Sequence, residues 1–137
     1  MMATASLPIL TALTAALMAL MSIKLTLDIV KLRRAERVVI GDGGHDQLAQ
    51  AVRLHGNFSE HAPITLIVLA LAELLGAWWP LVLLACGLLV AGRVLHARTF
   101  KDGQHNLSVR SLGMKFNLLA LLLGIGLSAG YAVWHLF

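Results

Sequence analysis

Four long apolar stretches account for most of this chain, and they restrict it to folds that lie in a membrane. The stretches cover residues 7–32, 51–78, 81–97 and 110–134. Each is close to the roughly 20 residues that a helix, rising about 1.5 Å per residue, needs to cross the hydrocarbon core of a bilayer. The mean hydropathy of +0.81, with 58% apolar and 13% charged residues, lies outside the usual range of soluble domains. Because the connections are short, we predict an all-α fold in which residues 1–137 form one bundle of four antiparallel transmembrane helices.

The first stretch superficially resembles a secretory signal peptide. No basic residue precedes its apolar run, and the run continues to Leu32 without a convincing cleavage site, so we expect a retained helix. A single cysteine, Cys86, provides no disulfide within the chain. The six histidines are scattered and lack metal-ligand spacing beside a carboxylate, so we expect no bound metal.

The eleven basic residues predict how the chain sits in the membrane, because they fall in two groups near the first and the third connection. The groups are Lys24, Lys31, Arg33, Arg34, Arg37 and Arg53, and Arg93, Arg98, Lys101, Arg110 and Lys115. Since cytoplasmic connections are enriched in Lys and Arg, both basic connections are expected in the cytoplasm and both termini on the opposite side. The excess positive charge, a net +4, is therefore expected on one face of the protein, where it suits anionic membrane lipids. We expect no nucleic acid partner.

Polar residues follow one face of the second stretch, near the first connection. Arg53, Asn57 and Glu60 stand at i, i+4 and i+7, and on a helix turning about 100° per residue they lie within roughly 60° of one another. They predict a polar stripe that enters the membrane. In a purely structural interpretation, Arg53 and Arg93 only extend to lipid headgroups, while Glu60 pairs with one of them and locks two helices together.

The third and fourth stretches place further polar residues at the same level. Arg93, His96 and Phe100 share a face at i, i+3 and i+7, and Arg110 and Ser111 begin the fourth stretch. Ionisable groups in lipid are costly and often mark a site, so they are expected to point into the bundle or a water-filled cavity. We therefore predict that side chains from three helices converge in one crevice near the inner interface.

Other polar and small residues predict structural roles. Lys24 and Asp28, at i and i+4, are expected to form an ion pair on the first helix. Glu73, near the far end of the second helix, is expected to reach the membrane interface. Gly126 and Gly130 form a small-x-x-x-small pattern, which predicts a close helix packing face.

Motifs on these helices resemble a known family. RLHGNFSE (53–60) is similar to the R-x-x-x-N-x-x-E motif on the second helix of the membrane-associated proteins in eicosanoid and glutathione metabolism (MAPEG). GRVLHARTF (92–100), followed by Arg110 and Ser111, resembles the third- and fourth-helix motifs of microsomal prostaglandin E synthase, which belongs to that family with microsomal glutathione transferase. The resemblance covers essentially the whole chain. Within the family, the chain is most similar to the bacterial branch.

The resemblance implies a homotrimer of four-helix subunits in the bacterial inner membrane, with glutathione bound as co-substrate in clefts between neighbouring subunits. The residues implied to hold or brace glutathione are Lys31, Arg53, Asn57, Glu60, His61, Arg93, His96, Phe100 and Ser111, and Arg110 is implied to face the sulfur as the catalytic residue. Relatives often carry tyrosine where this chain has His61 and Phe100, and both departures bear on how the thiolate is anchored.

The residue types suit glutathione independently of the resemblance. Glutathione carries two carboxylates and one ammonium group, which arginine guanidinium groups and the Glu60 carboxylate can pair with. Asn57 offers both a donor and an acceptor to peptide groups. A thiol with a pKa of about 8.5 is mostly protonated at neutral pH, and a nearby guanidinium such as that of Arg110 favours the thiolate.

Two functions remain open from the sequence. The first is a membrane-bound glutathione transferase or peroxidase, whose thiolate reacts with a lipophilic electrophile or a hydroperoxide dissolved in the bilayer. The second is a non-catalytic membrane protein that binds a lipid or amphiphile in the cleft between subunits, with Arg53 and Glu60 as structural partners. We favour the enzyme, because a site open to both cytosol and bilayer suits one water-soluble and one lipophilic reactant.

Overall fold

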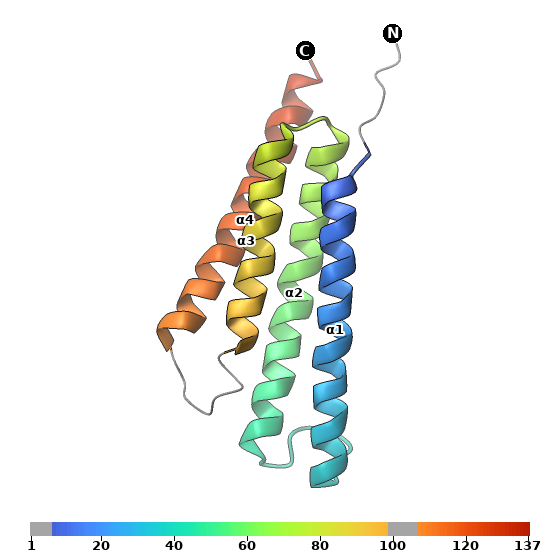
Figure 1. The fold of residues 1–137 in the computed structure, drawn as a ribbon, viewed down its shortest axis with the longest axis vertical. Coiled ribbons are helices and arrows are strands. Elements are labelled where there is room, and N and C mark those ends of the chain that lie inside the picture. Colours follow the sequence, from blue (N-terminus) through green and yellow to red (C-terminus); the bar gives the residue numbers. More distant parts are fainter. Residues whose placement is uncertain (1–6, 99–106) are drawn as a thin grey trace.

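Four α-helices form the parts of the chain that the computed structural model describes, residues 7–98 and 107–137 (Figure 1). The helices are α1 (Ile9–Glu36), α2 (Asp46–Leu74), α3 (Trp79–Arg98) and α4 (Leu107–Trp134). No strand occurs in these two described segments. The all-α fold predicted from the apolar stretches is confirmed, and each predicted stretch lies largely within one helix.

Three of the helices, α1, α3 and α4, are long and apolar enough to cross a membrane within the described residues. The second helix differs from the prediction because it begins at Asp46, well before the predicted stretch, and its first half carries most of the polar stripe. It has 29 residues, so its length suffices for a bilayer, but its polar half sets it apart from the other three. The first half of α2 is therefore the part of this helix that presents polar side chains to its surroundings.

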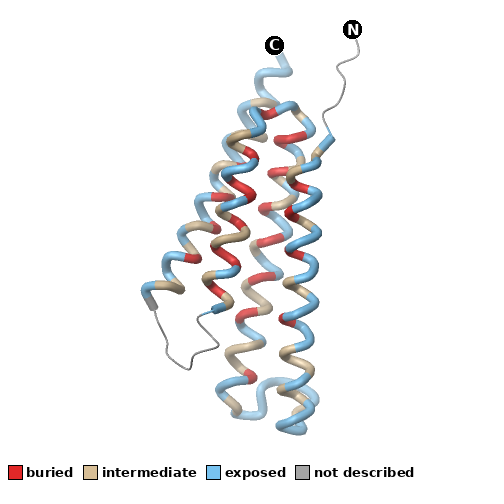
Figure 2. Tube along the Cα trace, viewed as in Figure 1, coloured by how far each residue is buried: buried red, intermediate tan, exposed pale blue. Residues whose placement is uncertain are grey.

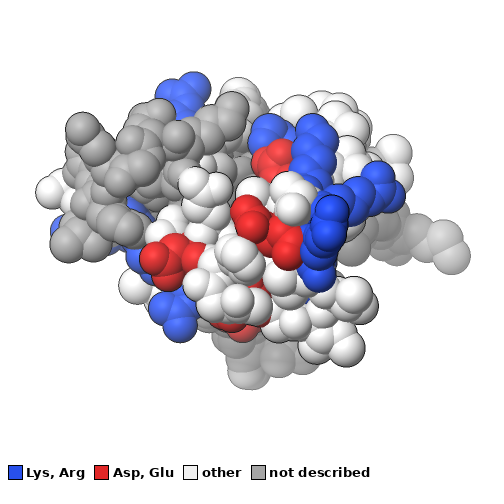
Figure 3. All heavy atoms as spheres, turned by 90° about the horizontal axis from the view of Figure 1, so that it is seen from below, with Lys and Arg blue, Asp and Glu red and all other residues white. Residues whose placement is uncertain are grey.

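Helices that follow each other in the chain run antiparallel, and α2 contacts each of the others, whereas α1 and α4 do not contact each other in the described part of the chain (Figure 1). One end of the bundle holds the last turns of α1 and α3, the first turns of α2 and α4, and the connection 37–45. We call it the basic end, and Figure 3 looks onto it and shows Lys and Arg side chains beside Asp and Glu side chains. The turn between α2 and α3 lies at the opposite end with the C-terminus. The described members of both basic groups thus belong to one end.

The buried side chains line the inward faces of the helices, while most of the outward faces are exposed (Figure 2). One cluster of the core includes Met18, Leu25, Phe58 and Leu89. Large apolar side chains also cover the outside of α1 and α4. They are Leu13, Leu17, Leu20, Ile23 and Leu27 on α1, and Leu118, Leu119, Leu122, Ile125 and Val133 on α4. Such surfaces suit lipid or a neighbouring subunit.

The connection 37–45 turns sharply by using glycines. Gly41, Gly43 and Gly44 have positive φ angles of 72°, 59° and 81°, a region that side chains with a Cβ atom rarely adopt. Arg33 Nη1 donates a hydrogen bond to the carbonyl of Val39 at 2.9 Å and ties the connection back to α1. The segment GDGG is thus a turn, and it lies directly beside the polar half of α2.

Helices α3 and α4 approach each other closely at Gly92 and Gly113. A Cβ atom on Gly92 would lie 2.8 Å from the carbonyl oxygen of Gly113 and 2.9 Å from the side chain of Asn117. Nothing lies within 4 Å of the corresponding position on Gly126 or Gly130. The predicted small-residue face therefore does not pack within this chain, and a different glycine pair joins the two helices beside Arg93.

Replacing Gly92 with alanine is expected to lower the free energy of unfolding by about 1–3 kcal/mol, because the added methyl group meets backbone atoms that cannot rotate away. Thermal unfolding in detergent, followed by circular dichroism, measures the effect. The matched control is Gly87→Ala on the same helix, where a Cβ atom meets nothing within 4 Å. The control should unfold at the wild-type temperature or above it, and equal unfolding temperatures for both variants would refute the close contact.

Candidate functional site

A polar groove of about 1020 Å³ lies at the basic end of the bundle. The residues of the predicted stripe on α2, Arg53, Asn57 and Glu60, line it together with His96 from α3 and Arg110 from α4. The stripe predicted on the second helix therefore meets side chains from the third and fourth helices in one crevice.

The side chains that line the groove differ in exposure. Arg53 and Glu60 are exposed, Asn57 and Arg110 are half-buried, and His96 is buried. The carboxylate of Glu60 forms no ion pair with Lys, Arg or His in the described residues, so the structure does not support its role as a lock between helices. Its placement leaves the carboxylate accessible to a ligand in the groove.

Arg93 was expected to line or brace the site, and the structure places it behind Asn57. Its side chain is buried and does not line the groove. Its Nη1 atom donates hydrogen bonds to Oδ1 of Asn57 at 3.0 Å and to the Asn57 carbonyl at 3.3 Å. The guanidinium also faces the ring of Phe58, with 5.7 Å between the guanidinium carbon and the ring centre. Arg93 therefore does not line the groove itself and is connected to it by its hydrogen bonds to Asn57.

Three further residues implied by the resemblance lie in the described part of the chain and do not line the groove. Lys31 is exposed on α1, and Ser111 is exposed on α4. His61 is half-buried on α2, where its carbonyl accepts a hydrogen bond from Thr65 Oγ1 at 2.8 Å. Phe100 lies outside the described residues.

Three groove residues that could bind a ligand are not predicted as site residues from the sequence. Arg33 of α1 is expected only in the basic surface for lipid headgroups, and neither Gln50 of α2 nor Asp42 of the connection 37–45 is singled out. Gln50 precedes Arg53 by three residues and Asn57 by seven, so the helical period that revealed the stripe also predicts Gln50 on the same face. No comparable signal was available for Arg33, because its position depends on how the turn returns the chain to α2.

The groove carries an excess of positive charge. Arg33, Arg53 and Arg110 line it, against the carboxylates of Asp42 and Glu60. Arginine guanidinium groups bind carboxylates in a two-point geometry, and a carboxylate can pair with an ammonium group. The groove therefore suits a ligand that carries more negative than positive charge and has several polar groups along its length.

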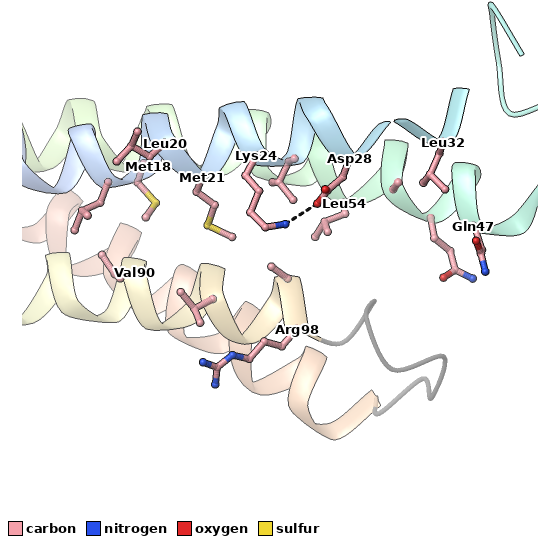
Figure 4. A pocket seen from close by; sticks show the side chains of 16 residues that line it. Met18, Leu20, Met21, Lys24, Asp28, Leu32, Gln47, Leu54, Val90 and Arg98 are labelled. Carbon is pink, nitrogen blue, oxygen red and sulfur yellow. Dashed lines mark hydrogen bonds and ion pairs between the residues drawn. The ribbon is translucent and has the colours of Figure 1, made fainter. Parts of the chain in front are cut away.

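A second groove, about 810 Å³ in volume, opens between α1, α2 and α3 (Figure 4). Met18, Met21 and Val90 give it apolar walls. Towards the basic end, Lys24 and Asp28 extend into it, and Lys24 Nζ lies 2.6 Å from Asp28 Oδ2. The predicted ion pair is confirmed, and it lies at the polar end of an otherwise apolar groove. Gln50 of α2 lines this apolar groove as well as the polar groove.

Comparison with known proteins identifies the scaffold that carries these two grooves. Residues 11–130 match the sequence model of the MAPEG family. The chain belongs to the MAPEG family. It is 38% identical over 126 residues to Inner membrane protein YecN of Escherichia coli K12, a match that covers 91% of this chain and 94% of YecN. YecN of Escherichia coli O6:H1 matches with the same identity and coverage.

Membership in the MAPEG family confirms the resemblance carried by the motifs of the second, third and fourth helices. The matched segment spans all of α2 and α3 and most of α1 and α4. It therefore includes every residue that lines the polar groove. The polar groove thus lies wholly within the part of the chain that matches the MAPEG family.

Proposed function

We propose that this MAPEG protein is a membrane-bound glutathione transferase or peroxidase. The observation that carries the proposal is the convergence of Arg53, Asn57, Glu60, His96 and Arg110 on one polar groove at the basic end. Cationic, acidic and amide groups along a single groove match a tripeptide with two carboxylates, one ammonium group and peptide bonds. Glutathione acts here as co-substrate, and the chemistry requires no metal.

The charged ends of glutathione find partners on both sides of the groove. Arg53 and Arg33 can hold carboxylates through two-point hydrogen bonds, and Glu60 can pair with the ammonium group. Arg110 is placed across from this stripe, on the first turns of α4. A thiol directed towards Arg110 would lose its proton more readily, because the adjacent guanidinium stabilises the negative charge of the thiolate.

The bound thiolate then reacts with a lipophilic partner from the bilayer. In the transferase reaction, sulfur forms a bond to an electrophilic carbon, and the leaving group departs with the electron pair of the broken bond. In the peroxidase reaction, two glutathione molecules are oxidised to the disulfide while a hydroperoxide is reduced to an alcohol and water. The thiol proton passes to water or to the departing oxygen.

The proposal includes a homotrimer in a bacterial inner membrane, with the basic end in the cytoplasm. The exposed apolar faces of α1 and α4 provide surface for neighbouring subunits and lipid. Lys31 lies outside the groove of its own chain, and in the proposed trimer it would contribute to the groove of a neighbour. The excess of Lys and Arg at the basic end favours the cytoplasmic orientation. YecN, by its name an inner membrane protein, supports the location.

A second candidate function is favoured by the apolar groove between α1, α2 and α3. A non-catalytic MAPEG protein could bind a lipid or amphiphile there, with an apolar chain along Met18, Met21 and Val90 and a polar head near the Lys24–Asp28 pair. In this case Arg53 and Glu60 would have no ligand to hold. The two functions therefore differ in whether glutathione binds.

Calorimetric titration of glutathione into the detergent-purified protein distinguishes them. We expect saturable binding that Arg53→Gln weakens by about tenfold, the loss expected when one charge-assisted contact is removed. Arg34→Gln, which removes an exposed arginine of α1 that does not line the groove, serves as the control and should bind like the wild type. Absence of glutathione binding, together with saturable binding of an anionic amphiphile, would support the second function instead.

A further inference from the structure

Arg93 is a buried cation with an incomplete set of partners. Its side chain is 1% exposed, and its Nη1 atom contacts only Asn57, at the distances given above. Within the described residues, no carboxylate forms an ion pair with Arg93, and its Nε and Nη2 atoms have no hydrogen-bond partner. A buried charge without a counter-ion is costly, so the contact with Asn57 calls for an explanation beyond packing.

The chemistry of arginine fixes the orientation of the Asn57 amide. A guanidinium group donates hydrogen bonds and cannot accept them, so the amide atom that faces Arg93 must be the oxygen. Asn57 also lines the polar groove. With Oδ1 held by Arg93, the Nδ2 amino group is the part of the amide that remains for a ligand in the groove.

We infer that Arg93 is a positioning residue that locks Asn57 as a hydrogen-bond donor. The group that Asn57 recognises through its Nδ2 amino group is then an oxygen acceptor, a carbonyl or a carboxylate. This narrows the expectation from the sequence, in which Asn57 offered both a donor and an acceptor. The inference rests on the proposed function for the identity of the ligand, glutathione, while the Arg93–Asn57 contact itself does not depend on it.

Asn57→Asp tests the inference, because the two side chains have nearly the same shape. Aspartate gives Arg93 the missing counter-ion and removes the amino group that donates into the groove. We expect the variant to unfold at a higher temperature than the wild type and to bind glutathione about tenfold more weakly or worse, which corresponds to the loss of one hydrogen bond to a charged group. A residue with a merely structural role would not separate stability from affinity in this way.

The matched control is Gln50→Glu, which makes the same change from amide to carboxylate on the groove wall without contacting Arg93. It measures the effect of the added negative charge alone, and it should leave the unfolding temperature unchanged and reduce affinity less than Asn57→Asp. A second test uses Arg93→Lys, which keeps the positive charge and loses the planar guanidinium group with its several N–H donors. Arg93→Lys should weaken glutathione binding in the wild-type background and add no further loss to Asn57→Ala.

The inference is overturned if Asn57→Asp binds glutathione as tightly as the wild type, if its unfolding temperature falls, or if the effects of Arg93→Lys and Asn57→Ala are additive. A wild-type protein that does not bind glutathione would refute the proposed function and the ligand assigned to Asn57. The unfolding temperatures of Asn57→Asp and Gln50→Glu would then still decide whether Arg93 holds the Asn57 oxygen.

Discussion

Replacing Arg110 with alanine should abolish the formation of bound thiolate and reduce glutathione-dependent turnover by about 100-fold or more, the effect of removing one charged group that stabilises an anion at a reacting centre. Arg110 lines the polar groove from the first turns of α4, opposite the α2 residues that are proposed to hold the rest of the tripeptide. Without the guanidinium, the thiol should keep the pKa of about 8.5 that a free thiol has. The ultraviolet absorbance of the thiolate, recorded on addition of glutathione, measures the effect.

Lys115→Ala provides the matched control for Arg110→Ala. Lys115 is an exposed cation on the same helix and does not line the groove. It should leave thiolate absorbance and turnover unchanged. Calorimetry on Arg110→Ala should detect glutathione binding through the remaining groove residues, which separates loss of activation from loss of the site. A thiolate signal that persists in Arg110→Ala would show that another group activates the thiol.

Replacing Glu73 with alanine should lower the free energy of unfolding by roughly 2–4 kcal/mol, through the loss of a helix cap and of charge-assisted hydrogen bonds. Glu73 is buried, contrary to the expectation that it reaches the membrane interface. Its carboxylate accepts hydrogen bonds from the main-chain N–H groups of Leu10 and Thr11, both at 2.9 Å, and from Thr11 Oγ1 at 2.7 Å. The first N–H groups of a helix lack partners within the helix, so Glu73 caps α1 and fastens it to α2.

Glu60→Ala is the control for Glu73→Ala, because it removes an exposed carboxylate from the same helix and should change stability by less than about 0.5 kcal/mol. Glu73→Gln should fall between the wild type and Glu73→Ala, since the amide keeps one acceptor oxygen. Chemical unfolding in detergent, followed by tryptophan fluorescence, gives the comparison. An unfolding curve of Glu73→Ala that coincides with that of the control would contradict the capping role.

The helices could be predicted from the sequence because lipid demands long apolar segments with internally satisfied backbones. Helix α2 begins at Asp46, before the apolar stretch 51–78 that the sequence predicts as a span. Its first turns are polar and exposed, so the apolar pattern gives no signal there. The burial of Glu73 and the contact of Gly92 with α4 are not predicted from the sequence for a related reason. A cap on another helix and a backbone contact between helices depend on tertiary packing, which helical periodicity does not encode.

The groove could be predicted in part, since residues spaced by helical turns share a face. The period of α2 predicts Arg53, Asn57 and Glu60 as one stripe, and in the structure His96 and Arg110 line the same groove. The position of Arg33 could not be predicted, because it depends on the turn at Gly41–Gly44. The sequence also gave no sign that Arg93 contacts the groove through Asn57, because helical period defines a face but not the depth of a side chain in the bundle.

The most direct measurement is an experimental structure of the assembled protein with glutathione added. The account predicts density for a tripeptide in the polar groove, in contact with Arg53 and Glu60, with the sulfur directed towards Arg110 and an acceptor oxygen beside Asn57. A groove that stays empty at saturating glutathione, or one filled by a lipid chain while Arg53 and Glu60 turn away from each other, would contradict it.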